Sequence, residues 1–280
     1  MYLIKEKYIL TPTVTKMIIS APLITKHADV GQFVMIRAEE DGERIPLTIA
    51  ENNPKDGTIT IIFQVVGRST YILNQLNEND RIPDVAGPMG KPSELEGLSR
   101  VLLVGGGVGC AILYPIAEKL HRLGTEIYTI IGFRNESLIF LEDQFVKISN
   151  RYQIMTDDGS YGRKGFVTDV LKCALDEQIA YDKVIAIGPV PMMKAVSDLT
   201  RKYHIPTVVS MNPIMVDGTG MCGGCRLSVG GQMKFACVDG PEFDGHLVDF
   251  DMVMKRNQLY QSQEKDAYLD VCKGVSHEQT

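Results

Sequence analysis

The sequence lacks the features that mark membrane-spanning, secreted and histidine-dependent catalytic proteins. No apolar run approaches the length needed to span a bilayer. Residues 1–13 alternate like a strand and lack the three-part pattern of a secretory signal peptide. The five histidines do not cluster, so their spacing indicates no Cys–His or Ser–His catalytic pair. We therefore expect a cytoplasmic protein that does not act at a membrane.

The sequence also has few cysteines and carries no net positive charge. The 280 residues carry a net charge of −6, which argues against nucleic acid and anionic membrane surfaces as partners. A composition of 44% hydrophobic and 23% charged residues is ordinary for a globular protein, and the length suits roughly two domains. Only six cysteines are present and three of them cluster, which favours metal binding in a reducing cytosol over a disulfide framework. Cys110, Cys173 and Cys272 are expected to be ordinary thiols.

The clustered cysteines, Cys222, Cys225 and Cys237, form the most informative stretch of the chain. Asp217 precedes Cys222 with Gly-Thr-Gly-Met between them, so the pattern is D-x₄-C-x₂-C…C. The plant-type [2Fe–2S] spacing is C-x₄-C-x₂-C…C, with a thiolate where this chain has a carboxylate. Because iron accepts both kinds of ligand, we predict a [2Fe–2S] cluster held by Asp217, Cys222, Cys225 and Cys237.

The residues around these ligands suit the same interpretation. Glycines at positions 218, 220, 223 and 224 let the backbone fold closely round inorganic sulfides. Met221 and Phe235 are expected to shield the cluster from water, which tunes its potential. Two alternatives stay open. Zinc also takes C-x₂-C spacing and would be held by the three cysteines and Asp217, or there is no metal and Asp217 is a turn residue.

The first part of the chain, residues 1–97, is predicted to form an antiparallel β barrel. Its segments are short, rich in Val, Ile, Thr and aromatic residues, and mostly bounded by turn residues. Short strands without intervening helices are typical of a small barrel. The predicted strands are residues 2–10, 14–20, 33–38, 45–50 and 58–66.

Three short segments of this barrel are candidates for ligand binding. The segment at residues 67–70 precedes an apolar helix expected at residues 71–76, and a glycine, hydroxyl groups and a helix N-terminus together make an anion site. A tight turn is predicted at residues 87–90. The candidate residues of the three segments are Arg44, Pro46, Leu47 and Thr48; Gly67, Arg68, Ser69 and Thr70; and Gly87 and Gly90.

The middle part, residues 98–210, is predicted to be a parallel α/β domain that binds a nucleotide. A buried strand at residues 99–104 runs into the loop GGGVG at residues 105–109, and a helix follows at residues 111–123. This order forms a pyrophosphate site at a helix N-terminus, although GGGVG is not the complete G-x-G-x-x-G fingerprint. Further strands are predicted at residues 126–132, 153–156, 183–187 and 207–210, and helices at residues 167–175 and 191–202.

A second loop, residues 188–193, follows the strand at residues 183–187. Loops at the carboxyl ends of parallel strands line one crevice, so both loops are expected to hold NAD(H) or NADP(H). Arg134 either meets a 2′-phosphate or is a solvated loop charge, and the acidic turn that begins at Asp157 disfavours a further phosphate, so NAD(H) is favoured. The candidate residues are Gly106, Gly107, Val108, Gly109, Arg134, Asp157, Gly188, Pro189 and Met192.

The last part of the chain begins where the strand at residues 207–210 ends. Residues 211–250 are predicted to hold the iron–sulfur cluster, and residues 251–280 form a polar tail. Part of this tail is expected to pack as a helix on the core or on another subunit. The last several residues are expected to be disordered.

The order of these segments resembles the ferredoxin–NADP reductase family. R-x-x-x-T, G-x-S-T and G-P-x-G segments precede a glycine-rich nucleotide loop. In that family the first motif is usually R-x-Y-S and holds the ring and phosphate of FAD, so the resemblance implies FAD on the barrel. Aligning the hydroxyl on Thr48 puts Leu47 at the tyrosine and Ile45 at the arginine. The aromatic residue is therefore missing from this motif, and Arg44 lies one residue out of register.

A barrel, a nucleotide domain and a C-terminal cluster loop in this order resemble one branch of that family. The branch includes the electron-transfer subunit of dihydroorotate dehydrogenase and the small subunit of NADH-dependent reduced ferredoxin:NADP oxidoreductase, also called sulfide dehydrogenase. An aspartate at the first ligand position, here Asp217, is similar to the second type.

The resemblance to the second type implies electron bifurcation. NAD(H) would exchange hydride with FAD, and electrons would pass through the [2Fe–2S] cluster to a larger flavin and [4Fe–4S] partner, and indirectly to ferredoxin. The chain has no further cysteine motif of its own for a [4Fe–4S] cluster. A dihydroorotate-type subunit, a stand-alone NAD(P)H:acceptor reductase acting on sulfide or polysulfide, and a redox-sensing or zinc-stabilised binding module stay as alternatives.

Overall fold

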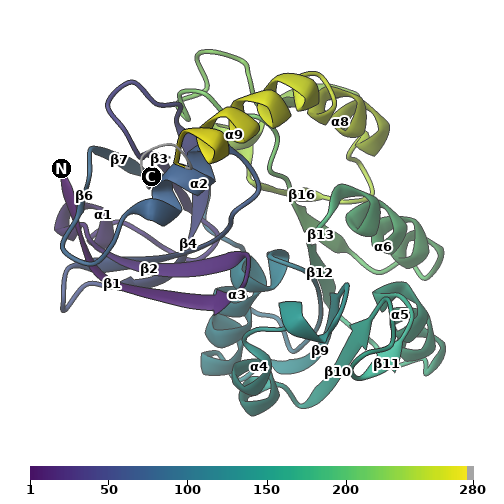
Figure 1. Ribbon diagram of the computed structural model, residues 1–280. Helices are drawn as coiled ribbons and strands as arrows, with labels where there is room; N and C mark the ends of the chain where they lie inside the picture. The colour runs from purple at the N-terminus through teal and green to yellow at the C-terminus, as the bar shows by residue number, and fades with distance from the viewer. Residues whose placement is uncertain (276–280) are drawn as a thin grey trace.

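The computed structural model of the chain describes residues 1–275, so the prediction about the last several residues lies outside the described part. Two seven-stranded sheets and one two-stranded hairpin make up the β structure of these residues. The first sheet is built from the N-terminal part of the chain (Figure 1). The second is built from the middle part and one C-terminal strand, β16, which lies within residues 211–250. The fold class predicted from the sequence is confirmed.

The first sheet is a nearly closed antiparallel barrel with the strand order β6-β1-β2-β5-β4-β3-β7. Every strand pair within it is antiparallel. Its strands are β1 (Tyr2–Thr11), β2 (Val14–Ser20), β3 (Phe33–Arg37), β4 (Ile45–Asn53), β5 (Thr58–Gln64), β6 (Arg81–Ile82) and β7 (Asp84–Met89), with helices α1 (Pro22–Thr25) and α2 (Arg68–Gln75) between them.

Alternating apolar side chains fill the barrel. Met17 lies opposite Ile61 and Ile19 lies opposite Ile59 in the β2–β5 pair, and all four side chains are completely buried. Successive residues of a strand point to opposite faces, so this register places one apolar set in the barrel core. The pattern of Val, Ile and Thr that predicted these strands is therefore the pattern that packs them.

One prediction for the barrel is wrong. Residues 87–90 were predicted as a tight turn, but Gly87 and Pro88 lie inside β7, which pairs with β3. The register of that pair shifts between Phe33 and Met35. Such a bulge is where a strand tolerates glycine and proline, because a proline removes one ladder hydrogen bond.

The second sheet has the order β11-β10-β9-β8-β12-β13-β16. All of its pairs are parallel except the one between β13 and β16, which is antiparallel. Its strands are β8 (Arg100–Gly106), β9 (Glu126–Phe133), β10 (Arg151–Thr156), β11 (Arg163–Lys164), β12 (Lys183–Ile187), β13 (Thr207–Ser210) and β16 (Glu242–Asp244).

Helices cover both faces of this sheet. Alternate residues of the central strand β8 pack into different cores, with Leu103 on the side of α3 (Gly109–Arg122) and α4 (Glu142–Ile148). Leu102 lies on the opposite side, with α5 (Val167–Asp176) and α6 (Val190–Lys202). A short 3₁₀ helix, η1 (Glu136–Leu138), follows β9. Burial on both faces explains the continuous apolar run of β8.

The C-terminal part contains the β14 (Arg226–Val229) and β15 (Gln232–Phe235) hairpin, followed by α7 (Ala236–Asp239), α8 (Phe250–Asn257) and α9 (Gln261–Val275). Helix α9 leads from α8 back to α2 of the barrel (Figure 1). There the rings of Tyr71 and Tyr268 meet edge to face, with their centroids 5.8 Å apart. The expected helical tail is therefore present, and it packs on the chain's own barrel.

Within residues 1–275, none of the helices combines the length and the apolar character that a membrane crossing requires.

Candidate functional site

The parallel sheet changes direction between β8 and β12. From β8 the chain proceeds outward through β9, β10 and β11, and then returns to place β12 on the other side of β8. In open α/β sheets, ligands bind outside the carboxyl ends of the strands at such a switch point. The two predicted nucleotide loops, residues 105–109 and 188–193, lie at the ends of β8 and β12 and so flank this point. They are shorter than predicted, because β8 runs to Gly106 and α6 begins at Val190.

The two loops touch each other. A Cβ atom added to Gly106 would lie 2.4 Å from Met192 Sδ and 3.0 Å from Pro189 Cδ. One added to Gly188 would lie 3.0 Å from the Gly106 Cα. Only glycine permits this approach, so the structure brings the predicted residues of both loops together. Helix α3 begins at Gly109 directly after Gly107 and Val108, and its N-cap residue Val108 makes no capping hydrogen bond with its side chain.

The next two loops along this edge hold the other predicted nucleotide residues. The Asp157 N–H donates to the Phe133 carbonyl at 3.0 Å and the Asp158 N–H donates to the Arg134 carbonyl at 3.3 Å. Hydrogen bonds from Ser160 hold the pKa of Asp158 below its usual value. Arg134 and Asp157 are exposed neighbours, and Arg134 makes no ion pair with any described residue. This edge of the sheet therefore carries both the positive charge of Arg134 and the negative charge of Asp157, the two charges on which the choice between NAD(H) and NADP(H) depends.

The arginines predicted to bind an anion on the barrel are paired with carboxylates. Arg44 donates to Asp84 from Nε at 2.9 Å and from Nη2 at 2.7 Å. Arg68 at the start of α2 forms an ion pair with Glu39 at 2.6 Å. An incoming diphosphate would have to compete with these carboxylates for the guanidinium groups.

The remaining barrel candidates lie on β4, at the start of α2 and along β7. In the β3–β4 pair, Pro46, Leu47 and Thr48 lie opposite Met35, Val34 and Phe33. Thr70 Oγ1 accepts the Gly67 N–H at 3.1 Å and donates to the Gly67 carbonyl, so this hydroxyl closes its own turn. The hydroxyl of Ser69, in the first turn of α2, has no hydrogen-bond partner among the described residues, which leaves it available to a ligand. Gly87 lies in β7, and Gly90 follows it beside Phe33 and Pro241.

The four predicted iron ligands form two pairs. Asp217 Oδ1 lies 3.3 Å from Cys222 Sγ, and Cys225 Sγ lies 3.3 Å from Cys237 Sγ. Hydrogen bonds, led by that from the Thr219 N–H at 3.0 Å, hold the pKa of the Asp217 carboxyl below its usual value. Burial raises the pKa of Cys237 to about 12.

This pairing fits a cluster with two irons. In a [2Fe–2S] cluster each iron takes two protein ligands, and each pair supplies two donor atoms close together. Among residues 1–275, no group of three or more His, Cys, Asp or Glu side chains is compact enough for a single metal ion. A mononuclear zinc site needs four ligands round one ion, so the arrangement suits the iron–sulfur interpretation better.

The cluster loop is buried on one side and exposed on the other. Cys225 and Cys237 are buried, whereas Cys222 is exposed. Phe235 lies beside the loop, 3.7 Å from where a Cβ of Gly223 would be. The prediction that Met221 shields the cluster is wrong for this chain alone, because 89% of Met221 is exposed.

The buried side of the loop packs on the barrel. Gly218 has a φ of +78°, and a Cβ there would lie 2.3 Å from Met89 Sδ and 2.7 Å from Met35 Cγ. Both methionines lie on strands that neighbour each other in the barrel, β3 and β7. Sequence reasoning missed them because an isolated Met in a strand gives no sign of a partner far away in the chain, and Gly218 is 129 positions from Met89 and 183 from Met35.

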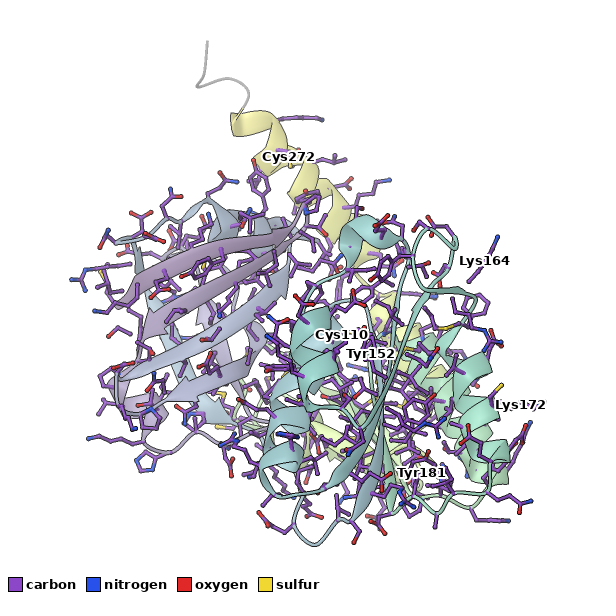
Figure 2. All side chains as sticks on the ribbon, turned by 90° about the horizontal axis from the view of Figure 1, so that it is seen from below. Cys110, Tyr152, Lys164, Lys172, Tyr181 and Cys272 are labelled. Atoms are coloured by element: carbon purple, nitrogen blue, oxygen red, sulfur yellow. The ribbon has the colours of Figure 1, made fainter. Side chains whose placement is uncertain are left out.

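The three cysteines outside the cluster loop are dispersed. Cys110 is a buried residue of α3 beside the parallel sheet, and burial raises its pKa far above the usual value. Figure 2 shows Cys110 beside Tyr152 in that part of the molecule, and Cys272 on α9 well away from both. Cys173 is exposed on α5. None of the three lies in the cluster loop, as the sequence predicted.

Comparison with known proteins matches the sequence to one family model and to two similar proteins. Residues 212–249 match the family model of the iron–sulfur cluster binding domain of dihydroorotate dehydrogenase B. Over 250 residues, the sequence is 50% identical to a dihydroorotate dehydrogenase B (NAD(+)) electron transfer subunit homolog of Thermotoga maritima, covering 89% of this chain and 88% of that protein. It is 48% identical to an uncharacterized protein of Clostridium beijerinckii, covering 99% of this chain and 96% of that protein.

A solved structure is similar over nearly the whole chain. It is that of the NADH-dependent reduced ferredoxin–NADP oxidoreductase, described for its insight into flavin-based electron bifurcation. The TM-score is 0.91 at 46% sequence identity, and the match covers 97% of this chain and 98% of the other.

Proposed function

We propose that this chain passes electrons between NAD(H) and a larger partner subunit. It belongs to the family of flavin and iron–sulfur electron-transfer subunits that includes those of dihydroorotate dehydrogenase B. Its cofactors are FAD, a [2Fe–2S] cluster and NAD(H). The observation that carries this proposal is the contact of Gly218 with Met35 and Met89. It sets the cluster loop directly on the barrel expected to hold the flavin.

The proposal assigns each cofactor to one part of the chain. Residues 1–97 would hold FAD, residues 98–210 would hold NAD(H), residues 211–250 would hold the cluster and residues 251–280 would form the tail. The FAD residues are Arg44, Pro46, Leu47, Thr48, Gly67, Arg68, Ser69, Thr70, Gly87 and Gly90. The NAD(H) residues are Gly106, Gly107, Val108, Gly109, Arg134, Asp157, Gly188, Pro189 and Met192, and the cluster ligands are Asp217, Cys222, Cys225 and Cys237.

Flavin accepts the electron pair of a hydride, and an iron–sulfur cluster carries single electrons. The chain's own residues would bind and orient these groups. Gly106 and Gly188 let the two nucleotide loops meet, so that the pyrophosphate would sit at the N-terminus of α3. Ser69 would give its free hydroxyl to the flavin phosphate. The proposal requires no side chain to transfer a proton. The alternative nucleotide is NADP(H).

A partner is supported by the exposed side of the cluster loop. Val216, Met221 and Val238 are exposed apolar side chains in or beside the loop that carries the exposed Cys222. Apolar side chains grouped at one place on a surface are typical of protein interfaces. We propose that this surface binds a larger flavin and [4Fe–4S] subunit in a heterodimer or larger assembly. That larger subunit would exchange electrons with ferredoxin and NADP. Cysteines that form no disulfide suit a cytoplasmic location.

The dihydroorotate type is the second candidate, because its family model matches residues 212–249. Anaerobic purification of the chain with its native neighbours separates the two. We expect a large flavin and iron–sulfur subunit, and NAD(P)H-linked reduction of ferredoxin by the complex. Co-purification with a dihydroorotate-oxidising subunit would favour the second candidate. A chain that purifies alone and passes electrons from NADH to small acceptors would contradict both.

The role of the loop is tested with a pair of cysteine variants. Cys222→Ser is expected to lose iron and NADH-driven electron delivery to the partner while keeping flavin. Cys173→Ser, which changes an exposed thiol on α5, serves as the control and should behave as the unaltered chain. Equal iron content in the two variants would count against Cys222 as a ligand.

A further inference from the structure

Two arginines hold the turn between Cys222 and Cys225. Arg226 Nη1 donates to the Gly223 carbonyl at 3.0 Å, and Arg256 Nη2 donates to the Gly224 carbonyl at 3.0 Å. Arg226 directly follows the turn, whereas Arg256 reaches it from α8, 32 positions along the chain. Both carbonyl groups of the two-residue spacer therefore have a guanidinium donor.

These contacts fix the direction of the peptide groups. In a planar trans peptide the C=O and N–H bonds point in opposite directions. The Gly223 carbonyl shares its peptide with the Gly224 N–H, which donates to Cys222 Sγ at 3.4 Å. The Gly224 carbonyl shares its peptide with the N–H of Cys225. An arginine that holds a carbonyl on the outer side of the turn thus directs the attached N–H toward the ligand side.

The two arginines also bring positive charge to the turn. Neither has a carboxylate within ion-pair distance among residues 1–275, in contrast to Arg44 and Arg68 on the barrel. Both side chains are half-buried. One carboxylate and three thiolates would give a bound cluster a net negative charge that increases on reduction. Nearby cations and N–H donors to sulfur stabilise the reduced form and raise the potential.

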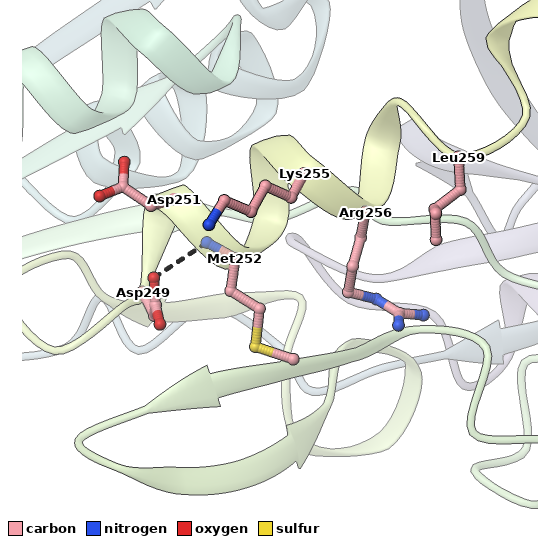
Figure 3. Close-up of a pocket in the computed structure, with 6 residues that line it drawn as sticks. All are labelled: Asp249, Asp251, Met252, Lys255, Arg256 and Leu259. Carbon is pink, nitrogen blue, oxygen red and sulfur yellow. Dashed lines mark hydrogen bonds between the residues drawn. The ribbon is translucent and has the colours of Figure 1, made fainter.

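Helix α8 holds Arg256 in place. Asp249 caps its N-terminus by accepting the Met252 N–H at 2.9 Å, and Phe250 and Val253 are buried in the core that also contains Cys225. Figure 3 shows the arginine pointing away from the acidic residues at the start of this helix. The guanidinium is therefore presented to the turn by a fixed element, not by a free loop.

We propose that Arg226 and Arg256 are positioning residues for the iron–sulfur cluster, which hold the two glycine carbonyls outward and raise the reduction potential of the cluster. This inference rests on the proposed ligands Asp217, Cys222, Cys225 and Cys237. It goes beyond them by assigning a role to two side chains that do not touch iron.

Lys255 supplies a matched control. It is exposed, precedes Arg256 on α8 and runs back along the helix on the side of Asp251 (Figure 3). Lys255→Gln removes one positive charge from the same helix without removing a bond to the turn. Arg256→Gln removes the same charge together with the bond to Gly224. Arg256→Lys keeps the charge but loses the planar fork of donors.

The test measures iron content, flavin content, the cluster's midpoint potential and the rate of iron loss to a chelator. Partners of metal ligands typically contribute 10- to 100-fold to metal affinity, so iron loss from Arg256→Gln should be roughly 10-fold faster or more. Its midpoint should move to more negative potential. Lys255→Gln should lose iron at the unaltered rate, with a smaller shift, and Arg256→Lys should recover part of the midpoint shift.

Arg226→Gln provides an independent measurement through the other carbonyl and should shift the midpoint in the same direction. Equal midpoints and iron-loss rates in Arg256→Gln and Lys255→Gln would overturn the inference, as would an unaltered midpoint in both arginine variants. Full flavin with depleted iron in Arg256→Gln, but not in Lys255→Gln, would support it. Absence of iron from the unaltered chain would instead count against the proposed ligands.

Discussion

Replacing Gly218 with alanine is expected to loosen the cluster loop from the barrel. Gly218 is buried at a φ of +78°, and a Cβ there would lie 2.3 Å from Met89 Sδ. The left-handed conformation costs a residue with a side chain about 1–2 kcal/mol, and forcing a methionine off its rotamer adds about 0.5–1.5 kcal/mol. The sum of about 1.5–3.5 kcal/mol corresponds to a roughly 10- to 400-fold lower population of the packed loop.

Iron loss to a chelator, followed by visible absorbance, is the assay for Gly218→Ala. The control is Gly97→Ala, because Gly97 has a similar φ of +73° but no atom within 4 Å of its Cβ position. We expect Gly97→Ala to lower thermal stability without speeding iron loss. A second substitution, Met89→Ala, should slow the iron loss of Gly218→Ala by removing the contact. Iron loss that is the same in both glycine variants would refute the packing of the loop on the barrel.

Three further predictions concern the nucleotide, the cluster and pH. Gly106→Ala should lower kcat/KM for NADH oxidation by an artificial acceptor about 10- to 100-fold, since displaced loops misplace the nucleotide; normal kinetics would contradict the proposed crevice. Asp217→Cys should keep flavin and shift the cluster's midpoint, and an unchanged midpoint and spectrum would remove Asp217 from the ligands. Burial raises the pKa of Glu242, whose carboxylate accepts from Ser93 at 2.5 Å. The free energy of unfolding should therefore fall as pH rises from the usual carboxyl pKa through the raised one. In denaturant titrations, Glu242→Gln should lack this pH-dependent fall in the free energy of unfolding. Identical pH profiles for the variant and the unaltered chain would exclude a contribution from Glu242.

Most of the fold could be predicted from local patterns. The alternation in residues 14–20 and 58–64 is the register in which Met17 meets Ile61, so pattern and packing coincide. The turn predicted at residues 87–90 failed because glycine and proline mark bulged strands as well as turns. The hairpin of β14 and β15 was missed, because its four-residue strands are too short to show a period.

The candidate sites could be predicted as segments but not as contacts. Spacing identified Cys222 and Cys225, yet nothing in their spacing indicates that Arg256 donates to the turn between them from another helix. In the same way, nothing in the local sequence indicates that Arg44 pairs with Asp84, which lies 40 positions along the chain. Met221 was expected to shield the cluster because it is apolar, but exposure is set by what packs against a residue, and this part of the surface is open.

The presence of flavin and cluster in one NADH-reducible chain is tested most directly by a visible spectrum of the anaerobically purified protein, with iron and flavin quantified. We expect about one FAD and about two irons per chain, and bleaching of both chromophores by NADH. Flavin without iron would indicate a simple reductase without a cluster, in which the Cys222–Cys237 loop has only a structural role. A folded protein with neither cofactor would contradict the proposed electron-transfer function.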